Sequence, residues 1–93
     1  MHLIADGETV VGRDSRAGLV LEDARISRRH AVLTRAGGRV VVADLGSRNG
    51  TFLNGRRVEG AAQALAPGDV LKVGDFTLVF DPQEAIVFAQ DPA

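Results

Sequence analysis

The feature that most restricts the fold of this chain is the spacing of its chain-breaking residues. Apolar runs are only a few residues long, and Gly, Pro, Asn or Asp interrupts them throughout the sequence. Short strands at this spacing predict an all-β sandwich or barrel. The longest segment that could form a helix, 60–66, allows only about two turns. The strands are expected at 2–5, 9–13, 19–21, 30–35, 39–45, 51–54, 56–58, 69–73, 76–81 and 85–88.

Several short segments mark the turns between these strands. Ala36-Gly37-Gly38 and Asn54-Gly55 supply the positive φ angles that tight hairpins need. Gly74-Asp75 is expected to do the same, and Pro67-Gly68 indicates a turn before the next strand. The sequence therefore predicts several hairpin connections.

The large apolar side chains indicate where the core lies. Phe76, Leu78 and Phe80 fall on one face of a strand, and the alternate positions fall on the other, as in a half-buried strand. Phe52 is expected to join them in the core. The phenylalanines are thus interpreted as structural residues.

Composition narrows the classes of function. The chain has 93 residues, a net charge of −1, 45% hydrophobic residues and no cysteine. This length predicts one domain spanning 1–93, and the charge argues against nucleic acid as a partner. Two widely separated histidines and no cysteine predict no metal site and no disulfide. The chain lacks a long apolar stretch and a secretory signal, so a cytoplasmic location and no membrane contact are expected.

The basic residues are unevenly distributed and nearly all of one type. Lys72 is the only lysine among the 11 basic residues, and many of the arginines fall in or beside turns of the first half. The planar guanidinium of arginine suits bidentate recognition of phosphate or carboxylate groups. The placement of the arginines therefore indicates an anion-binding role.

Three polar segments lie at predicted strand boundaries. Gly12-Arg13 ends one strand, Ser27–His30 leads into another, and 48–50 precedes a third. Loops of a sandwich cluster at the ends of its sheets, so distant segments can meet at one rim. Guanidinium groups, a hydroxyl, a carboxamide and backbone N–H groups at such a rim would suit an oxyanion.

The same segments carry a resemblance to a known family. GR at 12–13, SRRH at 27–30 and LGSRNGTFLNG at 45–55 resemble the signature of the forkhead-associated (FHA) domain, a phosphothreonine-peptide-binding β-sandwich. The resemblance covers a core of about 10–80. It implies two packed, mostly antiparallel sheets with about eleven strands, with a C-terminal strand and tail in 82–93. The segment before Gly12 is shorter than the family's usual first strand.

The resemblance also implies roles for individual residues. Arg13 would place its guanidinium against the phosphate, and Ser27 would donate its hydroxyl to a phosphate oxygen. Arg28 would offer its backbone N–H, and Arg48 would lie beside the phosphothreonine. Asn49 would hydrogen-bond the peptide backbone next to the phosphorylated residue.

Other residues are expected to shape the loops without touching the ligand. Gly12, Gly46 and Gly50 would provide bends that let residues 48 and 49 project at the rim. His30 resembles a family histidine that braces the loops from inside.

Arg25, two residues before Ser27, has two interpretations. It would favour an acidic side chain a few positions after the phosphothreonine, or it is a solvated loop arginine paired with Glu22 or Asp23.

The resulting hypothesis is a phosphothreonine-dependent protein-binding module in Ser/Thr kinase signalling, without cofactor or catalytic activity, within a larger protein. A family member that docks partners without phosphate is the main alternative. A nucleophilic set of Ser27, His30 and Asp44 is disfavoured because the sequence lacks a nucleophile elbow.

Overall fold

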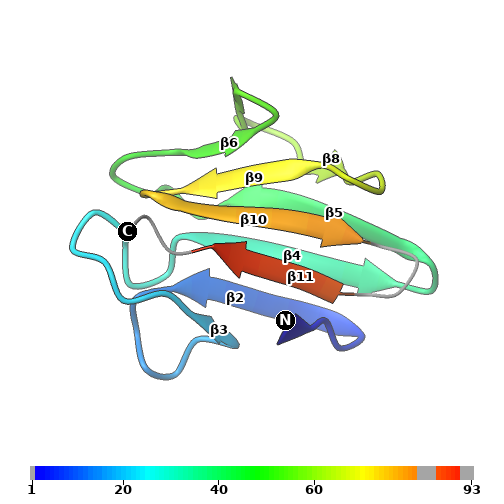
Figure 1. Cartoon of the computed structure of the whole chain (residues 1–93), viewed down its shortest axis with the longest axis horizontal. Coiled ribbons are helices and arrows are strands. Elements are labelled where there is room, and N and C mark those ends of the chain that lie inside the picture. The colour runs from blue at the N-terminus through cyan, green and yellow to red at the C-terminus, as the bar shows by residue number, and fades with distance from the viewer. Residues whose placement is uncertain (1, 82–85, 91–93) are drawn as a thin grey trace.

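Two β-sheets packed face to face form the molecule, as the computed structural model of residues 2–81 and 86–90 shows (Figure 1). This part of the chain holds eleven strands and no helix, which confirms the predicted all-β sandwich. Each predicted strand range overlaps an observed strand, although position 85 of the last range lies outside the described residues. The strands are β1 (His2–Leu3), β2 (Gly7–Gly12), β3 (Leu19–Val20), β4 (Ala31–Ala36), β5 (Arg39–Asp44), β6 (Thr51–Leu53), β7 (Arg56–Arg57), β8 (Gln63–Ala64), β9 (Val70–Val73), β10 (Phe76–Asp81) and β11 (Ile86–Gln90).

The topology is mostly antiparallel, as expected. The six-stranded sheet has the order β1-β11-β10-β9-β6-β7, and the five-stranded sheet has the order β3-β2-β4-β5-β8. Among the described strands, only β2 and β3 pair in parallel. The described residues contain no helix long and apolar enough to cross a membrane.

The segment 60–66, expected as the longest possible helix, instead contributes the edge strand β8. Gln63 and Ala64 pair with Val42 and Val41 of β5, and the Leu65 N–H donates to Val40 O at 2.9 Å. A helix of two turns is marginal by itself. The edge of the sheet offers this backbone partners and buries Leu65, so the strand forms instead.

The predicted turns are confirmed by the strand registers, although Ala36 belongs to β4 and Gly38 has no positive φ angle. Residues 37–38 join β4 to β5, 54–55 join β6 to β7, and 74–75 join β9 to β10. Asn54 also has a role that the sequence did not reveal. Its side chain donates to Asp69 Oδ1 at 3.0 Å and accepts from the Val70 N–H at 2.9 Å, which ties the turn to β9.

The core lies between the sheets, and both contribute to it. Leu78 and Phe80 of β10 are 0% and 1% exposed, whereas the alternate positions Thr77 and Val79 are only partly buried. The predicted alternation along β10 is therefore confirmed. The buried apolar residues are Ile4, Val11, Leu19, Leu21, Ile26, Ala31, Leu33, Val40, Val42, Val58, Leu65, Leu71, Val73, Leu78 and Phe80.

The expectation that Phe52 anchors this core is wrong. On β6 the inward positions are Thr51, which is fully buried, and Leu53, which packs against the core. Phe52 is half-buried on the outer face, where it pairs with Lys72 of β9. Thr51 takes the inward position because its hydroxyl donates to Asp44 Oδ1 at 2.7 Å, and side chains on a strand alternate between faces.

This difference predicts unequal costs for two phenylalanine substitutions. Phe80→Ala should lower the free energy of unfolding by about 3–5 kcal/mol because it leaves a cavity in the core. Phe52→Ala should cost only about 1 kcal/mol because it removes half-buried outer surface. Urea titration of both variants measures the difference, and equal losses would contradict the outward placement of Phe52.

Candidate functional site

Three loops meet at one end of the sandwich, which is called the rim below. They follow β2, connect β3 to β4, and connect β5 to β6, and all three lie at the left end of the molecule in Figure 1. Hydrogen bonds donated by backbone N–H groups join them. The Arg13 N–H donates to Ser27 O at 3.0 Å, and the Arg48 N–H donates to Ser27 Oγ at 3.0 Å. The three sequence segments expected to converge therefore do so.

Gly12 explains how the end of β2 comes so close to the second loop. A Cβ at this position would collide with the carbonyl oxygen of Arg28 and lie 3.1 Å from that of Ser27. The backbones pack directly on each other, so glycine is needed here for space and not for an unusual φ angle. This contact sets the position of the residue that follows, Arg13.

Arg13 and Ser27 present unused donors at the rim. The Nε of Arg13 donates to Ile26 O at 3.0 Å, which fixes the side chain and leaves its terminal nitrogens without a partner in the described residues. Ser27 Oγ accepts from the Arg48 N–H, so its own hydrogen remains to be donated. A guanidinium and a hydroxyl in this arrangement can both donate to one oxyanion.

The other predicted contact residues are exposed at the same end. The side chains of Arg28 and Arg48 form no ion pair within residues 2–81. Asn49 Nδ2 donates to Arg25 O at 2.8 Å, which holds the carboxamide in place. Its Oδ1 has no donor among the described residues, so it can accept a backbone N–H from a ligand.

His30 lies behind the rim, fully buried, and joins two of its loops. Its Nδ1 accepts from the Ser27 N–H at 3.0 Å. The other ring nitrogen, Nε2, must therefore carry the proton and donates to Gly50 O at 2.8 Å. His30 thus makes no outward contact, in keeping with the bracing role that the family resemblance implies.

A carboxylate that the sequence analysis did not assign to the rim holds the third loop. Asp44 Oδ2 accepts from the Gly46 and Ser47 N–H groups at 3.0 and 2.9 Å, and Oδ1 accepts from the Ser47 hydroxyl at 2.5 Å. Burial raises the pKa of Asp44, but the hydrogen bonds from Ser47 and Thr51 outweigh it and leave this pKa below its ordinary value. The Asp-x-x-Ser spacing, typical of side-chain-stabilised turns, was the available signal.

The loop reaches Gly50 in a conformation that few other residues adopt. Its φ angle is +87°, its N–H donates to Ser47 Oγ at 3.0 Å, and its carbonyl oxygen accepts from His30. Both backbone groups are therefore fixed. Gly46 also has a positive φ, of +75°, so two of the expected bends are observed. Arg48 and Asn49 project between them.

The geometry does not support a nucleophilic Ser–His–Asp set. His30 faces the backbone N–H of Ser27 and not its hydroxyl. Asp44 contacts Ser47 and Thr51 and makes no bond to His30. No proton relay joins the three side chains.

Arg25 lies beside the rim with its charge already partnered. Its Nε lies 3.4 Å from Asp23 Oδ1, and its Nη2 forms an ion pair with Asp75. The first pairing was one expected for a loop arginine, and the second ties this loop to the β9–β10 turn. Two carboxylates offset its charge, which weakens the hypothesis that Arg25 selects an acidic peptide residue.

Comparison with known proteins agrees with this arrangement. A family model described as FHA domain matches residues 9–74. The glycogen accumulation regulator GarA of Mycolicibacterium smegmatis is 41% identical over 78 residues, which make up 84% of this chain and 48% of that protein. The chain therefore spans about half the length of this curated relative.

Solved structures show the same fold. One, from an analysis of phosphothreonine-dependent FHA domain interactions, is 34% identical with a TM-score of 0.77, over 82% of this chain and 77% of that chain. The N-terminal FHA domain of Rad53p from S. cerevisiae, solved with a phosphothreonine peptide, is 31% identical. Its TM-score is 0.66, over 72% of this chain and 56% of that chain.

The close contact at Gly12 predicts that Gly12→Ala is costly. The added methyl would push β2 away from Arg28 O, with an expected loss of roughly 2 kcal/mol in the free energy of unfolding. Gly38→Ala is a matched control, because a Cβ there meets nothing within 4 Å and its φ is not positive. Urea titration compares them, and equal stabilities would argue against the contact.

The hydrogen bonds to Asp44 predict a dependence of stability on pH. Its folded-state pKa is lower than the ordinary value of 3.8, so its stabilisation is full above that pH and is lost as pH falls through the folded pKa. Asp44→Asn should cost about 2 kcal/mol at neutral pH. Its stability should also fall less steeply in acid than that of the natural protein. Thermal unfolding between about pH 7 and pH 2 tests this, and parallel curves would exclude it.

Proposed function

The chain belongs to the forkhead-associated domain family, and we propose that its rim binds phosphothreonine-containing peptides. The observation that carries the proposal is the position of Arg13 beside Ser27. Both are anchored by bonds to neighbouring loops, and both keep donors for a ligand. Such donors suit the oxygens of a phosphate, which accepts several hydrogen bonds at once.

Charge at the rim supports the same ligand. Arg13, Arg28 and Arg48 form no ion pair in the described residues, whereas Arg16 and Arg25 do. A phosphothreonine carries about −1.5 to −2 charges at neutral pH. A ligand with a single carboxylate carries only one negative charge and would compensate less of the positive charge at the rim.

Each residue has a separate part in the proposed complex. Arg13 and Ser27 hold phosphate oxygens, joined by the backbone N–H and the charge of Arg28. Arg48 flanks the phosphothreonine. Asn49 Oδ1 accepts from the peptide backbone, so the ligand is recognised as a peptide and not only as a phosphate.

The expected affinity is moderate. A hydrogen bond to a charged group contributes roughly 1.5–3 kcal/mol, and association costs about 4 kcal/mol or more. Three or four such bonds therefore leave a modest net gain, which suits reversible signalling. One buried methyl is worth only about 0.8 kcal/mol, so a preference for phosphothreonine over phosphoserine needs geometric selection beyond burial.

The comparisons support a binding role. The related yeast domain was solved with a phosphothreonine peptide, and GarA is described as a regulator. We infer that this chain likewise recruits a protein partner after a Ser/Thr kinase has acted, and that it has no catalytic activity of its own. We further infer that it works in the cytoplasm as a module of a longer protein.

A second mode, docking of a protein without phosphate, is favoured by one observation. A groove of about 600 Å³ lies on the outer face of the six-stranded sheet. Phe52 and Val70 give it an apolar wall, and Asn49 forms its border with the rim. A partner could lie here without touching Arg13, and phosphate dependence separates the two modes.

Binding of matched phosphothreonine and threonine peptides tests the proposal, with sequences chosen from an oriented phosphothreonine library. Only the phosphorylated form should bind well. Arg13→Ala and Ser27→Ala should each weaken it by about tenfold or more, because each removes a bond to a charged group. Isothermal titration calorimetry provides the affinities.

The matched control is Arg39→Ala, which removes an exposed arginine from the first position of β5, next to the turn between β4 and β5 at the other end of the sandwich (Figure 1). It should bind like the natural protein. Equal binding of the threonine peptide, or equal effects of the Arg13 and Arg39 substitutions, would replace the proposal with phosphate-independent docking.

A further inference from the structure

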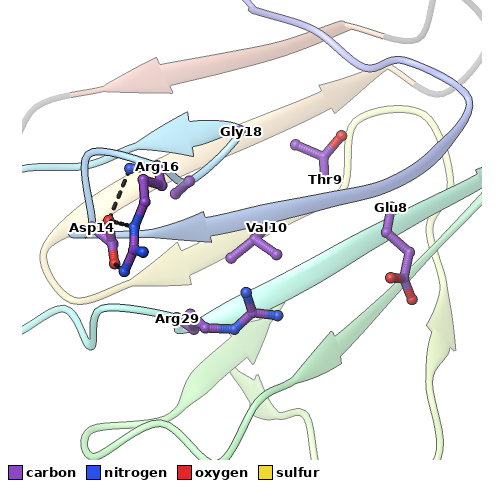
Figure 2. A pocket seen from close by; sticks show the side chains of 8 residues that line it. Glu8, Thr9, Val10, Asp14, Arg16, Gly18 and Arg29 are labelled. Atoms are coloured by element: carbon purple, nitrogen blue, oxygen red, sulfur yellow. Dashed lines mark hydrogen bonds and ion pairs between the residues drawn. The ribbon is translucent and has the colours of Figure 1, made fainter.

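Arg29 lies next to the rim but occupies a separate pocket. This pocket has a volume of about 500 Å³ and lies beside β2 of the five-stranded sheet. Figure 2 shows the Arg29 side chain lying alongside Val10, with Asp14 and Arg16 at one end and Glu8 farther along the strand. The pocket is lined by Glu8, Thr9, Val10, Asp14, Arg16, Ala17, Gly18 and Arg29.

One of the two carboxylates that line the pocket, that of Asp14, is already bound to another arginine. Asp14 Oδ2 lies 2.9 Å from Arg16 Nη2, and Oδ1 accepts from Arg16 Nε at 3.2 Å and from its backbone N–H at 2.9 Å. These bonds lower the pKa of Asp14 to about 2, so it is ionised and paired. Arg29 makes no hydrogen bond or ion pair through its side chain in the described residues.

The number of unpaired cations exceeds what one phosphate needs. Arg29 joins Arg13 and Arg48, and none of the three has a carboxylate partner in residues 2–81. Arg28 forms no ion pair there either, although its charge acts on Asp14. A single phosphothreonine supplies at most about two negative charges. Positive charge therefore remains for a second anionic group.

The pocket is within reach of a ligand held at the rim. Arg13 and Asp14 are consecutive, as are Arg28 and Arg29, and the two segments are joined by the Asp14 N–H donating to Arg28 O at 3.2 Å. Arg13 and Arg28 lie at the rim, and the next residue of each segment, Asp14 or Arg29, lines the pocket. An extended peptide advances about 3.3 Å per residue, so its flank can reach the pocket from the rim.

We propose that this pocket binds a second anionic side chain of the same peptide, with Arg29 as the residue that recognises it. The inference rests on the proposed phosphothreonine binding and adds a specificity-determining residue to it. The group is a carboxylate or a second phosphate, since both match the planar fork of arginine. Phosphate gives the larger gain because it carries more charge and more acceptor oxygens.

The negative charge of Glu8 provides a further test of anion binding in this pocket. It lines the same pocket and has no ion pair with Arg29. Its charge repels an incoming anion, so Glu8→Gln should strengthen binding of peptides with a second negative group. The same substitution should leave peptides with neutral flanks unaffected.

The experiment compares three peptide series on the intact chain. All carry one phosphothreonine, and the flanks are neutral, or carry one glutamate, or carry a second phosphothreonine, with the added group moved through both flanks. At low salt, the best glutamate peptide should bind about threefold more tightly than the neutral one. The best doubly phosphorylated peptide should bind about tenfold more tightly. Both gains should shrink at about 0.5 M salt.

Arg29→Ala should abolish these gains while keeping the affinity for the neutral peptide, and Arg39→Ala should keep both. Circular dichroism checks that each variant is folded. Equal binding of all three series would overturn the proposal, as would an Arg29→Ala variant that weakens every peptide by the same factor. If no phosphothreonine peptide binds, the proposed function fails too, whereas loss of the gain alone leaves it standing.

Discussion

A buried imidazole is the interaction on which the arrangement of the rim depends. His30 accepts from Ser27 on one side and donates to Gly50 on the other, with no exposure to solvent. An unpaired polar group at this depth is costly, so both loops are held where they satisfy the ring. The apolar core fixes the sheets, but it does not by itself specify where two loops meet. The histidine supplies that specification.

Anchored and exposed residues of the site have different roles. Ser27, Gly50 and the Asn49 carboxamide are fixed by bonds that exist before any ligand binds. This preorganisation reduces the cost of association. By contrast, Arg28 and Arg48 are exposed, and ordering such long side chains costs rotamer entropy. Specificity should therefore come mainly from the fixed groups, while the exposed arginines add attraction that depends on salt.

The sequence revealed the strands and the convergence of the rim because both depend on local patterns. Breaker spacing located every described strand except β8, and the three polar blocks fell at strand ends. It failed where a distant hydrogen bond decides the outcome. The outward orientation of Phe52 follows from the hydrogen bond between Thr51 and Asp44. The strand within 60–66 forms because it can pair with the edge of β5. The pairing of Arg25 with Asp75 joins residues far apart in sequence, which no local pattern indicates.

Local pairing of charges, and not the net charge of −1, determines what the rim attracts. Interactions between exposed charges are screened within about 8–10 Å at physiological salt, so carboxylates elsewhere do not neutralise Arg13. These carboxylates do affect an extended ligand. A nucleic acid carries phosphates over its whole length and would also meet some of the chain's 12 acidic residues. A compact dianion on a peptide meets only the unpaired arginines, so a chain that is slightly acidic overall can still select a small, densely charged group.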